Sequence, residues 1–325
     1  MNKISVAICT YNGAKHVKQQ LDSIINQTLR VNEIVVGDDG SSDNTIGIIE
    51  EIRNEHTEIE WNIVINKPGL GCCANFDDTI KRCTGDIIFL SDQDDIWDSK
   101  KVETIVNWFE LNPQRDVVFS NASFMDDNSQ PFTEKRLFDV LGINTHTLAI
   151  MEKGFYLETF MQHNRATGAT MALRKSFVSS YKIDRDAVIG KHQLHDQVIA
   201  VAAAADNRLG AINIPLIKYR IYKEQNMGLA SWISNPSTFT DPYAPFHITE
   251  QIENLPEKIT ERVRFCRKRY LYRTSFLCLD VITHIFDYIR MYKGAWYNVF
   301  LYDMLQGFFH KYIRGDSKIF LDAAE

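Results

Sequence analysis

The chain has 325 residues, of which 45% are hydrophobic and 24% charged, so it has the composition of an ordinary globular protein with enough apolar material for a sizeable core. Its formal net charge of −6 argues against a nucleic-acid-binding protein held by phosphate contacts. Six cysteines without CxxC spacing, and an N-terminal segment without the apolar core of a signal peptide, favour reduced thiols and a cytoplasmic location.

The first 120 residues alternate between short apolar, β-rich runs and helical patterns. The apolar runs predict strands at 4–9, 33–37, 62–66, 86–90 and 116–120. Polar turns and helical periodicity separate the runs, which is the pattern of parallel strands joined by right-handed crossovers. We therefore expect an α/β fold with a mostly parallel sheet flanked by helices.

The pattern is less regular after residue 120. Residues 121–165 show little periodicity apart from a helix expected near 147–160. Beyond them, 167–173 and 216–222 resemble strands, and 195–205 is an Ala-rich helical segment.

Composition divides the chain into three parts. We expect a catalytic domain over 1–225, a linker over 226–254 and a helical, basic and aromatic C-terminal extension over 255–325. The residues from Pro256 onward carry 12 Lys and Arg against 8 Asp and Glu, whereas the residues before it carry 24 against 34. The charge of the extension is therefore opposite to that of the preceding domain.

Three polar loops follow predicted strands, at the strand ends where open α/β sheets bind ligands. They are Thr10–Asn12, Asp38–Asp43 and Ser91–Asp95. In the second loop, we expect Asp43 to cap the following helix.

The Ser91–Asp95 loop places three carboxylates within four positions, which is electrostatically costly without a cation. Oxygen ligands of this kind suit Mg²⁺ or Mn²⁺ shared with substrate phosphates. In isolation, a solvated acidic turn that caps a helix is the simpler interpretation. Its position in the same predicted sheet as the Asp38–Asp43 loop favours the metal site.

The segments ISVAICTYNG (4–13), DDGSSD (38–43) and FLSDQDDIW (89–97) resemble, in this order, the family 2 glycosyltransferases with the Rossmann-like GT-A fold. The last segment is similar to the branch labelled rhamnosyltransferase-like, and the resemblance covers about residues 1–225. It implies an inverting enzyme that moves a sugar, with rhamnose as one candidate, from a nucleotide-diphosphate sugar to a hydroxyl of a saccharide or lipid-linked acceptor. The expected setting is cell-surface polysaccharide synthesis.

The resemblance also implies roles for individual residues. Asp94 matches the direct metal ligand of the family, with Asp92 as the second carboxylate of the motif. The residues expected to contact the nucleotide-sugar are Thr10, Tyr11, Asn12, Asp39, Asn75, Asp92 and Arg220. Among them Asn75 is the loosest match, and Arg220 is expected at the diphosphate.

Asp196, in the segment His195-Asp196-Gln197, resembles the family's catalytic base. The alternative is an N-cap, because a carboxylate at a helix N-terminus is stabilised by roughly 0.3–1 kcal/mol. That placement lowers its pKa, so a base role requires burial or nearby like charges.

Tyr222 stands where many members of the family have a metal-shell histidine, and a neutral phenol is a poor ligand for a hard cation. Strong metal dependence is therefore in doubt. This departure keeps a second function open, a non-catalytic nucleotide-sugar-binding protein on the same scaffold. A dinucleotide-dependent dehydrogenase is disfavoured, because the first predicted strand ends in TYNG and not in GxGxxG.

The C-terminal extension combines basic residues with aromatic and aliphatic ones. Such a helix suits the surface of an anionic membrane, which would place the protein on the inner face of that membrane. Packing on the catalytic domain or on a second copy in an oligomer explains the same pattern, so both interpretations stay open. The basic residues are Arg262, Arg264, Arg267, Lys268, Arg269 and Arg273.

Overall fold

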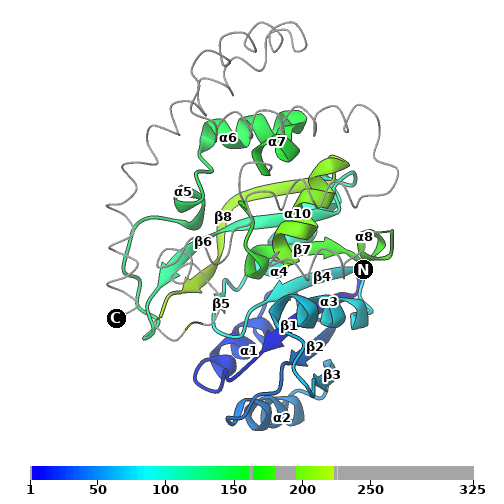
Figure 1. The fold of residues 1–325 in the computed structure, drawn as a ribbon, viewed down its shortest axis with the longest axis vertical. Helices are drawn as coiled ribbons and strands as arrows, with labels where there is room; N and C mark the ends of the chain where they lie inside the picture. Colours follow the sequence, from blue (N-terminus) through cyan, green and yellow to red (C-terminus); the bar gives the residue numbers. More distant parts are fainter. Residues whose placement is uncertain (1, 161–163, 181–194, 223–224, 226–325) are drawn as a thin grey trace, which may run out of the picture.

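The computed structural model describes residues 2–160, 164–180, 195–222 and 225, which build a mixed sheet covered by helices (Figure 1). Within this part of the chain the sheet has eight strands in the order β3-β2-β1-β4-β7-β6-β8-β5. The strands are β1 Ile4–Thr10, β2 Glu33–Asp38, β3 Glu60–Ile65, β4 Ile87–Ser91, β5 Ile96–Trp97, β6 Val117–Met125, β7 Met171–Arg174 and β8 Leu209–Arg220. Neighbours pair in parallel except where β7 or β5 takes part.

Helices cover both faces of the sheet, and the central strands are therefore apolar on both sides. Along β1, Val6 and Ile8 join one hydrophobic cluster, whereas Ala7 and Cys9 join the other. Successive side chains of a strand point to opposite faces, so a strand that is covered on both faces has no polar alternation. This explains why the predicted strands were continuous apolar runs.

The helices segregate between the two clusters. On the face reached by Val6, α1 (Val17–Ile25), α2 (Thr45–Glu55) and α4 (Lys101–Leu111) supply buried side chains. On the other face, α3 (Cys72–Arg82), α7 (Tyr156–Phe160) and α10 (His195–Ala205) do so. The remaining helical segments are α5 Leu137–Val140, α6 Thr145–Ile150, a π-helical segment Met151–Phe155, a 3₁₀ turn Gly168–Thr170 and α8 Lys175–Ser180.

The strand order reverses beside β1. From β1 the chain builds β2 and then β3 to one side, and β4 returns to the other side of β1. In open α/β sheets this reversal leaves a crevice at the carboxyl ends of the two strands, where ligands bind. The loops after Thr10 and Ser91 both begin at this crevice.

The predicted mostly parallel α/β sheet is confirmed, and several boundaries differ from the predictions. β6 continues to Met125, into a segment predicted to be irregular, because it pairs with β8 over most of its length. β8 itself begins at Leu209, well before the predicted 216–222 strand.

The predicted N-cap of α2 is wrong. Asn44 occupies the cap position without a side-chain bond, and Asp43 accepts from Thr45 N and Ala14 N, both at 3.0 Å. Asp43 therefore lies one residue before the cap position, where it accepts from the first N–H of α2 and joins the helix to the Ala14 loop.

The predicted linker (226–254) and helical extension (255–325) lie outside the described residues, so the domain boundary at residue 225 stays a prediction. In the described part of the chain, no helix combines the length and apolar character needed to cross a membrane.

Candidate active site

A cavity of about 460 Å³ lies beside the carboxyl ends of β1, β2 and β3. Its lining comes from Tyr11, Asp39, Gly40, residues 66–69 and Gly71. Tyr11 is 46% exposed as a residue, and its aromatic ring offers a surface on which a flat ring can stack. The cavity therefore joins an aromatic face to a carboxylate.

The two adjacent carboxylates after β2 have different environments. Asp38 is fully buried and accepts hydrogen bonds from Ser41 N at 2.8 Å and from Thr10 Oγ1 at 2.8 Å. Asp39 lines the cavity, and its two oxygens accept from Leu70 N at 2.6 Å and Gly71 N at 2.9 Å. Asp38 therefore shapes the turn, whereas Asp39 is the carboxylate placed at the cavity.

Thr10 and Asn12 flank Tyr11 but their side chains bond to other loops. Thr10 is 2% exposed, and its hydroxyl donates to Asp38. Asn12 has a φ of 50°, and its side chain accepts from Ser42 N at 2.8 Å. Of these three predicted nucleotide contacts, only Tyr11 lines the cavity. Direct contact of Thr10 or Asn12 with a nucleotide stays a prediction.

Gln93 is a functional candidate that the sequence did not single out. Its side-chain amide accepts from Tyr11 N at 2.8 Å and donates to Tyr11 O at 3.1 Å. Gly13 allows this approach, because a Cβ there would lie 2.2 Å from Gln93 Oε1. Gln93 thus joins the acidic loop to the Tyr11 loop, although the two are 82 positions apart in sequence.

Asn75 is 2% exposed and does not line the cavity. Its amide donates to Gly37 O at 2.7 Å and accepts from Asn66 Nδ2 at 2.9 Å. These bonds tie the cavity loop at Asn66 to the end of β2. The position supports a role in holding the loop, and nucleotide contact by Asn75 stays a prediction.

Two of the three carboxylates in the loop after β4 are buried, and the third, Asp92, is half-buried. Asp94 is 6% exposed and Asp95 is 1% exposed. Burial and the neighbouring Asp94 raise the pKa of Asp92 to about 7, and burial raises the pKa of Asp94 above its usual range. Asp95 Oδ2 is buried without a hydrogen-bond partner in the described structure. The ionised form of such a cluster is favoured by a nearby positive charge.

Lys101 is a buried cation that could compensate these carboxylates, but its ammonium binds other groups. Its ammonium donates to Ala169 O at 2.8 Å and lies 3.8 Å from the centre of the Trp97 ring. Burial lowers the pKa of Lys101 to about 7, although Asp95 and Asp92 oppose this shift. Lys101 therefore neutralises the carboxylates only in part.

Arg220, predicted at the diphosphate, is fully buried among protein acceptors. Its guanidinium donates to Asp94 O at 2.6 Å, Asp127 O at 2.9 Å and Gln19 Oε1 at 2.6 Å. The sequence favoured an anion as its partner, whereas backbone carbonyls and an amide satisfy it here. A contact between Arg220 and a diphosphate stays a prediction, and it requires the guanidinium to leave these acceptors.

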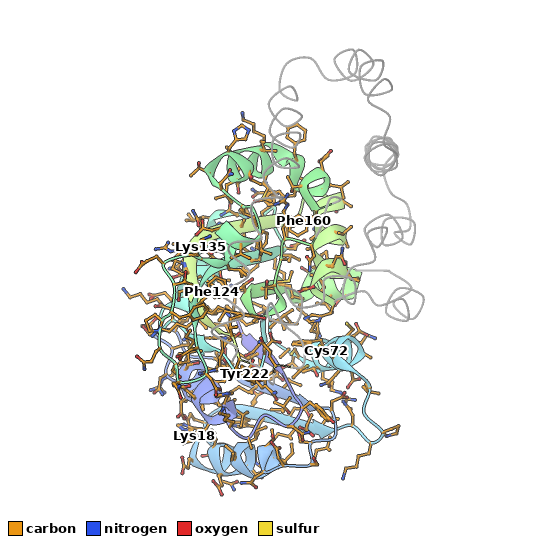
Figure 2. The ribbon with its side chains drawn as sticks, turned by 60° about the vertical axis from the view of Figure 1, so that its left-hand side comes forward. Lys18, Cys72, Phe124, Lys135, Phe160 and Tyr222 are labelled. Atoms are coloured by element: carbon orange, nitrogen blue, oxygen red, sulfur yellow. The ribbon has the colours of Figure 1, made fainter. Side chains whose placement is uncertain are left out.

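Tyr222 contacts the predicted metal ligand directly. Its hydroxyl donates to Asp94 Oδ2 at 2.7 Å, and burial together with Asp94 raises the pKa of the phenol, so it stays neutral. Figure 2 labels Tyr222 near the centre of the molecule, among side chains from several elements. The residue that departs from the family pattern is therefore part of the acidic site.

Asp196 lies in the first turn of α10 and is 7% exposed. Its oxygens accept from Asn164 Nδ2 at 2.9 Å, Gln197 N at 2.6 Å and Gly168 N at 3.1 Å. Burial nevertheless raises the pKa of Asp196 above its usual value. The burial that a base role required is thus present, while the role itself stays a prediction.

Charge interactions connect Asp196 to the acidic loop. The Asp196 carboxylate raises the pKa of Asp92, and the neighbouring His195 lowers it. His195 stacks on Phe76 of α3 with ring centres 4.0 Å apart. Asp92 therefore interacts electrostatically with both Asp94 and Asp196, and Gln93 joins the acidic loop to the Tyr11 loop. None of these three carboxylates lines the cavity to which Asp39 belongs.

The donor set fits a divalent cation that also binds substrate oxygens. In the described residues, no three His, Cys, Asp or Glu side chains form a group that could hold a metal ion alone. Mg²⁺ and Mn²⁺ are commonly held by one or two carboxylates together with phosphates and water. Asp94 and Asp92, whose negative charges are only partly compensated by the protein, suit that arrangement.

Comparison with curated proteins gives partial alignments. The chain is 36% identical over 126 residues to a dTDP-rhamnosyl transferase, RfbG, of Shigella flexneri, covering 37% of this chain and 40% of that protein. It is 35% identical over 109 residues to an uncharacterised glycosyltransferase of Haemophilus influenzae, covering 34% of this chain and 33% of that protein. These alignments span a third to two fifths of the relatives' length.

Among solved structures, the mannosyltransferase PcManGT of Pyrobaculum calidifontis, in complex with GDP-Man and Mn²⁺, superposes with a TM-score of 0.59 at 16% identity. The match covers 99% of this chain and 85% of that one. At this identity the similarity establishes the fold, and the predicted GT-A architecture is confirmed.

The sequence model described as Glycosyl transferase family 2 matches residues 5–181, more than half of the chain. The chain therefore belongs to glycosyl transferase family 2.

Proposed function

We propose that this protein is an inverting glycosyltransferase that moves a sugar from a nucleotide-diphosphate donor to a hydroxyl group of an acceptor. The observation that supports the proposal is the cavity lined by Tyr11 and Asp39, next to a loop whose Asp92 interacts electrostatically with Asp94 and Asp196. The family, whose named relatives include a rhamnosyl transferase, supports sugar transfer in general.

The nucleotide would bind in the cavity between Tyr11 and Asp39. A base or ribose can stack on the exposed ring of Tyr11, and its N–H or O–H groups can donate to the Asp39 carboxylate. Gln93 fixes the Tyr11 backbone through two hydrogen bonds, so it keeps the ring beside the acidic loop. The diphosphate then extends from the cavity toward Asp92 and Asp94.

Asp94 and Asp92 are the residues that would hold Mg²⁺ or Mn²⁺. A bound cation would offset the negative charge that develops on the leaving diphosphate. The raised pKa values of both carboxylates mean that protons leave the site when the cation binds. Metal affinity is therefore expected to increase with pH.

Asp196 would act as the general base. Its carboxylate takes the proton from the acceptor hydroxyl, and that oxygen forms a bond to the anomeric carbon as the bond to the diphosphate oxygen breaks. Attack from the face opposite the leaving group inverts the configuration. Asn164 and Gly168 hold the carboxylate in place during this step.

The donor sugar we propose is rhamnose, because the DQDDIW segment resembles the rhamnosyltransferase-like branch and one relative is a dTDP-rhamnosyl transferase. A saccharide or lipid-linked acceptor in cell-surface polysaccharide synthesis suits the same resemblance. The location we propose is the cytoplasm, with the basic extension at the inner face of the membrane.

A panel of nucleotide-sugars tests the function. Wild-type protein with Mg²⁺ or Mn²⁺ is expected to be stabilised thermally by at least one UDP-, GDP- or dTDP-sugar, because a ligand of the folded state raises apparent stability. Release of nucleoside diphosphate with a saccharide acceptor should follow. If none of these donors binds or turns over, the proposal fails.

Two substitutions separate binding from chemistry. Asp94→Asn should weaken metal-assisted donor binding, whereas Asp196→Asn should lower kcat by roughly 100-fold or more and leave donor binding unchanged. Asp78→Asn, at a surface ion pair with Arg82, is the matched control and should behave as wild type. Unchanged turnover in both site variants would refute the assignment.

The alternative, a nucleotide-sugar-binding protein without catalysis, rests on the departure at Tyr222. It is favoured if calorimetry shows donor binding while no acceptor of the panel supports transfer or hydrolysis.

A further inference from the structure

Tyr222 and Asp94 form a close pair that connects two distant parts of the chain. The Tyr222 hydroxyl lies 2.7 Å from Asp94 Oδ2, although the residues are 128 positions apart. Tyr222 is the second residue after β8, and Asp94 lies in the loop after β4. The phenol hydroxyl is the donor of this pair, and Asp94 Oδ2 is the acceptor.

The backbone of the acidic loop is fixed from the same side. Arg220 donates from its Nε to Asp94 O at 2.6 Å, and its backbone N–H donates to Asp95 Oδ1 at 2.9 Å. Arg220 and Tyr222 are both at the end of β8, so one strand end holds the backbone and the carboxylate of the loop. The Asp94 side chain therefore has few orientations available, because both its backbone and its carboxylate are held.

Neighbouring side chains also hold the Tyr222 ring. The His16 ring meets it edge-on, with centres 5.2 Å apart, and His16 Nε2 lies 3.0 Å from Asp127 Oδ1. His16 is 6% exposed, so this packing is internal. The position of the phenol hydroxyl is therefore set by contacts outside the acidic loop.

We propose that Tyr222 is a positioning residue for the divalent cation. Its hydroxyl binds Asp94 Oδ2 and leaves Asp94 Oδ1 to the metal, so Tyr222 orients the metal ligand and does not itself ligate the cation. This inference rests on the proposed function, since it assigns a cation to Asp94. Groups that orient a metal ligand by hydrogen bonding are worth about 10- to 100-fold in metal affinity. Tyr222 thus supports cation binding without ligating the cation.

The test compares Tyr222→Phe with wild type in a titration of Mn²⁺, followed by the electron paramagnetic resonance of the free ion. UDP, GDP and dTDP are each present in separate series. Tyr222→Phe removes one oxygen and keeps the ring against His16. We expect its Mn²⁺ affinity to fall about 10-fold, as for other groups that orient a metal ligand.

Tyr156→Phe is the matched control, because the Tyr156 hydroxyl is also internal and donates to a carboxylate, Glu152, at 2.7 Å, away from the acidic loop. Its Mn²⁺ affinity should equal that of wild type. Nucleotide affinity without metal, and the thermal midpoint without ligand, should be the same in wild type and Tyr222→Phe. A general loss of structure would change these two quantities, whereas a positioning role does not.

The outcomes distinguish the inference from the proposed function. Mn²⁺ affinity of Tyr222→Phe within twofold of wild type, or an equal loss in Tyr156→Phe, would overturn the positioning role while donor binding by wild type still supports the enzyme. Wild-type protein that binds neither Mn²⁺ with any of the three diphosphates nor a nucleotide-sugar would overturn both.

Discussion

At the scale of single residues, the surroundings of Asp196 set the pH range in which it can act as a base. Burial raises its pKa, and a base must be deprotonated to accept a proton. The rate should therefore fall as pH falls through this raised pKa. Asn164 opposes the shift, because its donated hydrogen bond favours the ionised carboxylate.

Asn164→Ala is expected to move the acidic limb of the pH–rate profile to higher pH, because it removes a donor from the ionised form of Asp196. The measurement is kcat/KM for the acceptor between pH 5 and 9. Asn112→Ala, at the end of α4, removes an amide that bonds to Trp108 O and serves as control. An acidic limb at the same pH in all three proteins would contradict the base assignment.

Gln93→Ala should weaken nucleotide binding by about 1 kcal/mol, the usual net value of a hydrogen bond, since the Tyr11 backbone loses both of its bonds to this side chain. Calorimetry of the nucleoside diphosphate that stabilises wild type measures the change. Gln130→Ala, in an exposed turn, is the comparison. Equal affinity in the two variants would remove Gln93 from the site.

The sequence allowed some of these residues to be predicted and concealed others. Asp39 and Asp94 follow apolar strands, and Asp196 lies in a segment that resembles the family's acidic motif, so the ordered motifs suffice to predict them. The contacts of Gln93 and Tyr222 depend on which loops become neighbours across long stretches of sequence. Arg220 was predicted from the chemistry of its side chain, which does not reveal that protein carbonyls already satisfy it.

At the scale of elements, α3 packs directly against the end of β2. A Cβ at Gly37 would lie 2.1 Å from Thr79 Oγ1 and 2.4 Å from Asn75 Oδ1. Both residues belong to α3, and Asn75 holds the cavity loop. The absence of a side chain at Gly37 therefore sets the distance between helix and strand.

Gly37→Ala is expected to lower the free energy of unfolding by about 1–3 kcal/mol, the usual cost of overpacking a core. Urea denaturation measures this change. The variant should also bind nucleotide more weakly, because a displaced α3 moves Asn75 and the loop at Asn66. Wild-type stability in Gly37→Ala would show that the helix can shift without cost.

Periodicity predicted the strands that are buried on both faces, since each forms a continuous apolar run. It did not predict that β7 lies antiparallel between β4 and β6, or that the two-residue β5 pairs with β8. Pairing partners depend on the crossovers between distant segments, and a run of a few residues carries no signal for them. The segment at 121–165 was predicted as irregular because its helices are short and interrupted, as at Gly154 with φ of 95°.

At the scale of the whole molecule, the described residues form two hydrophobic clusters separated by the sheet, and both clusters draw on residues from most of the described chain. The basic C-terminal extension is a separate source of charge. If it binds a membrane, the full chain should co-sediment with anionic phospholipid vesicles at low salt and be released at 0.5 M NaCl, because salt screens such attraction. A chain that ends at residue 225 should stay in solution, and equal sedimentation of both would contradict this role.

The bonds from Leu70 N and Gly71 N to Asp39 mean that this carboxylate already has partners before any ligand arrives. A carboxylate has about four lone-pair sites, so an incoming N–H or O–H can bind beside the two peptide groups without displacing them. A compound of the same shape that lacks these hydrogens leaves the remaining sites unused. The backbone therefore fixes the direction of this carboxylate in advance, and the carboxylate selects molecules by the hydrogens they carry.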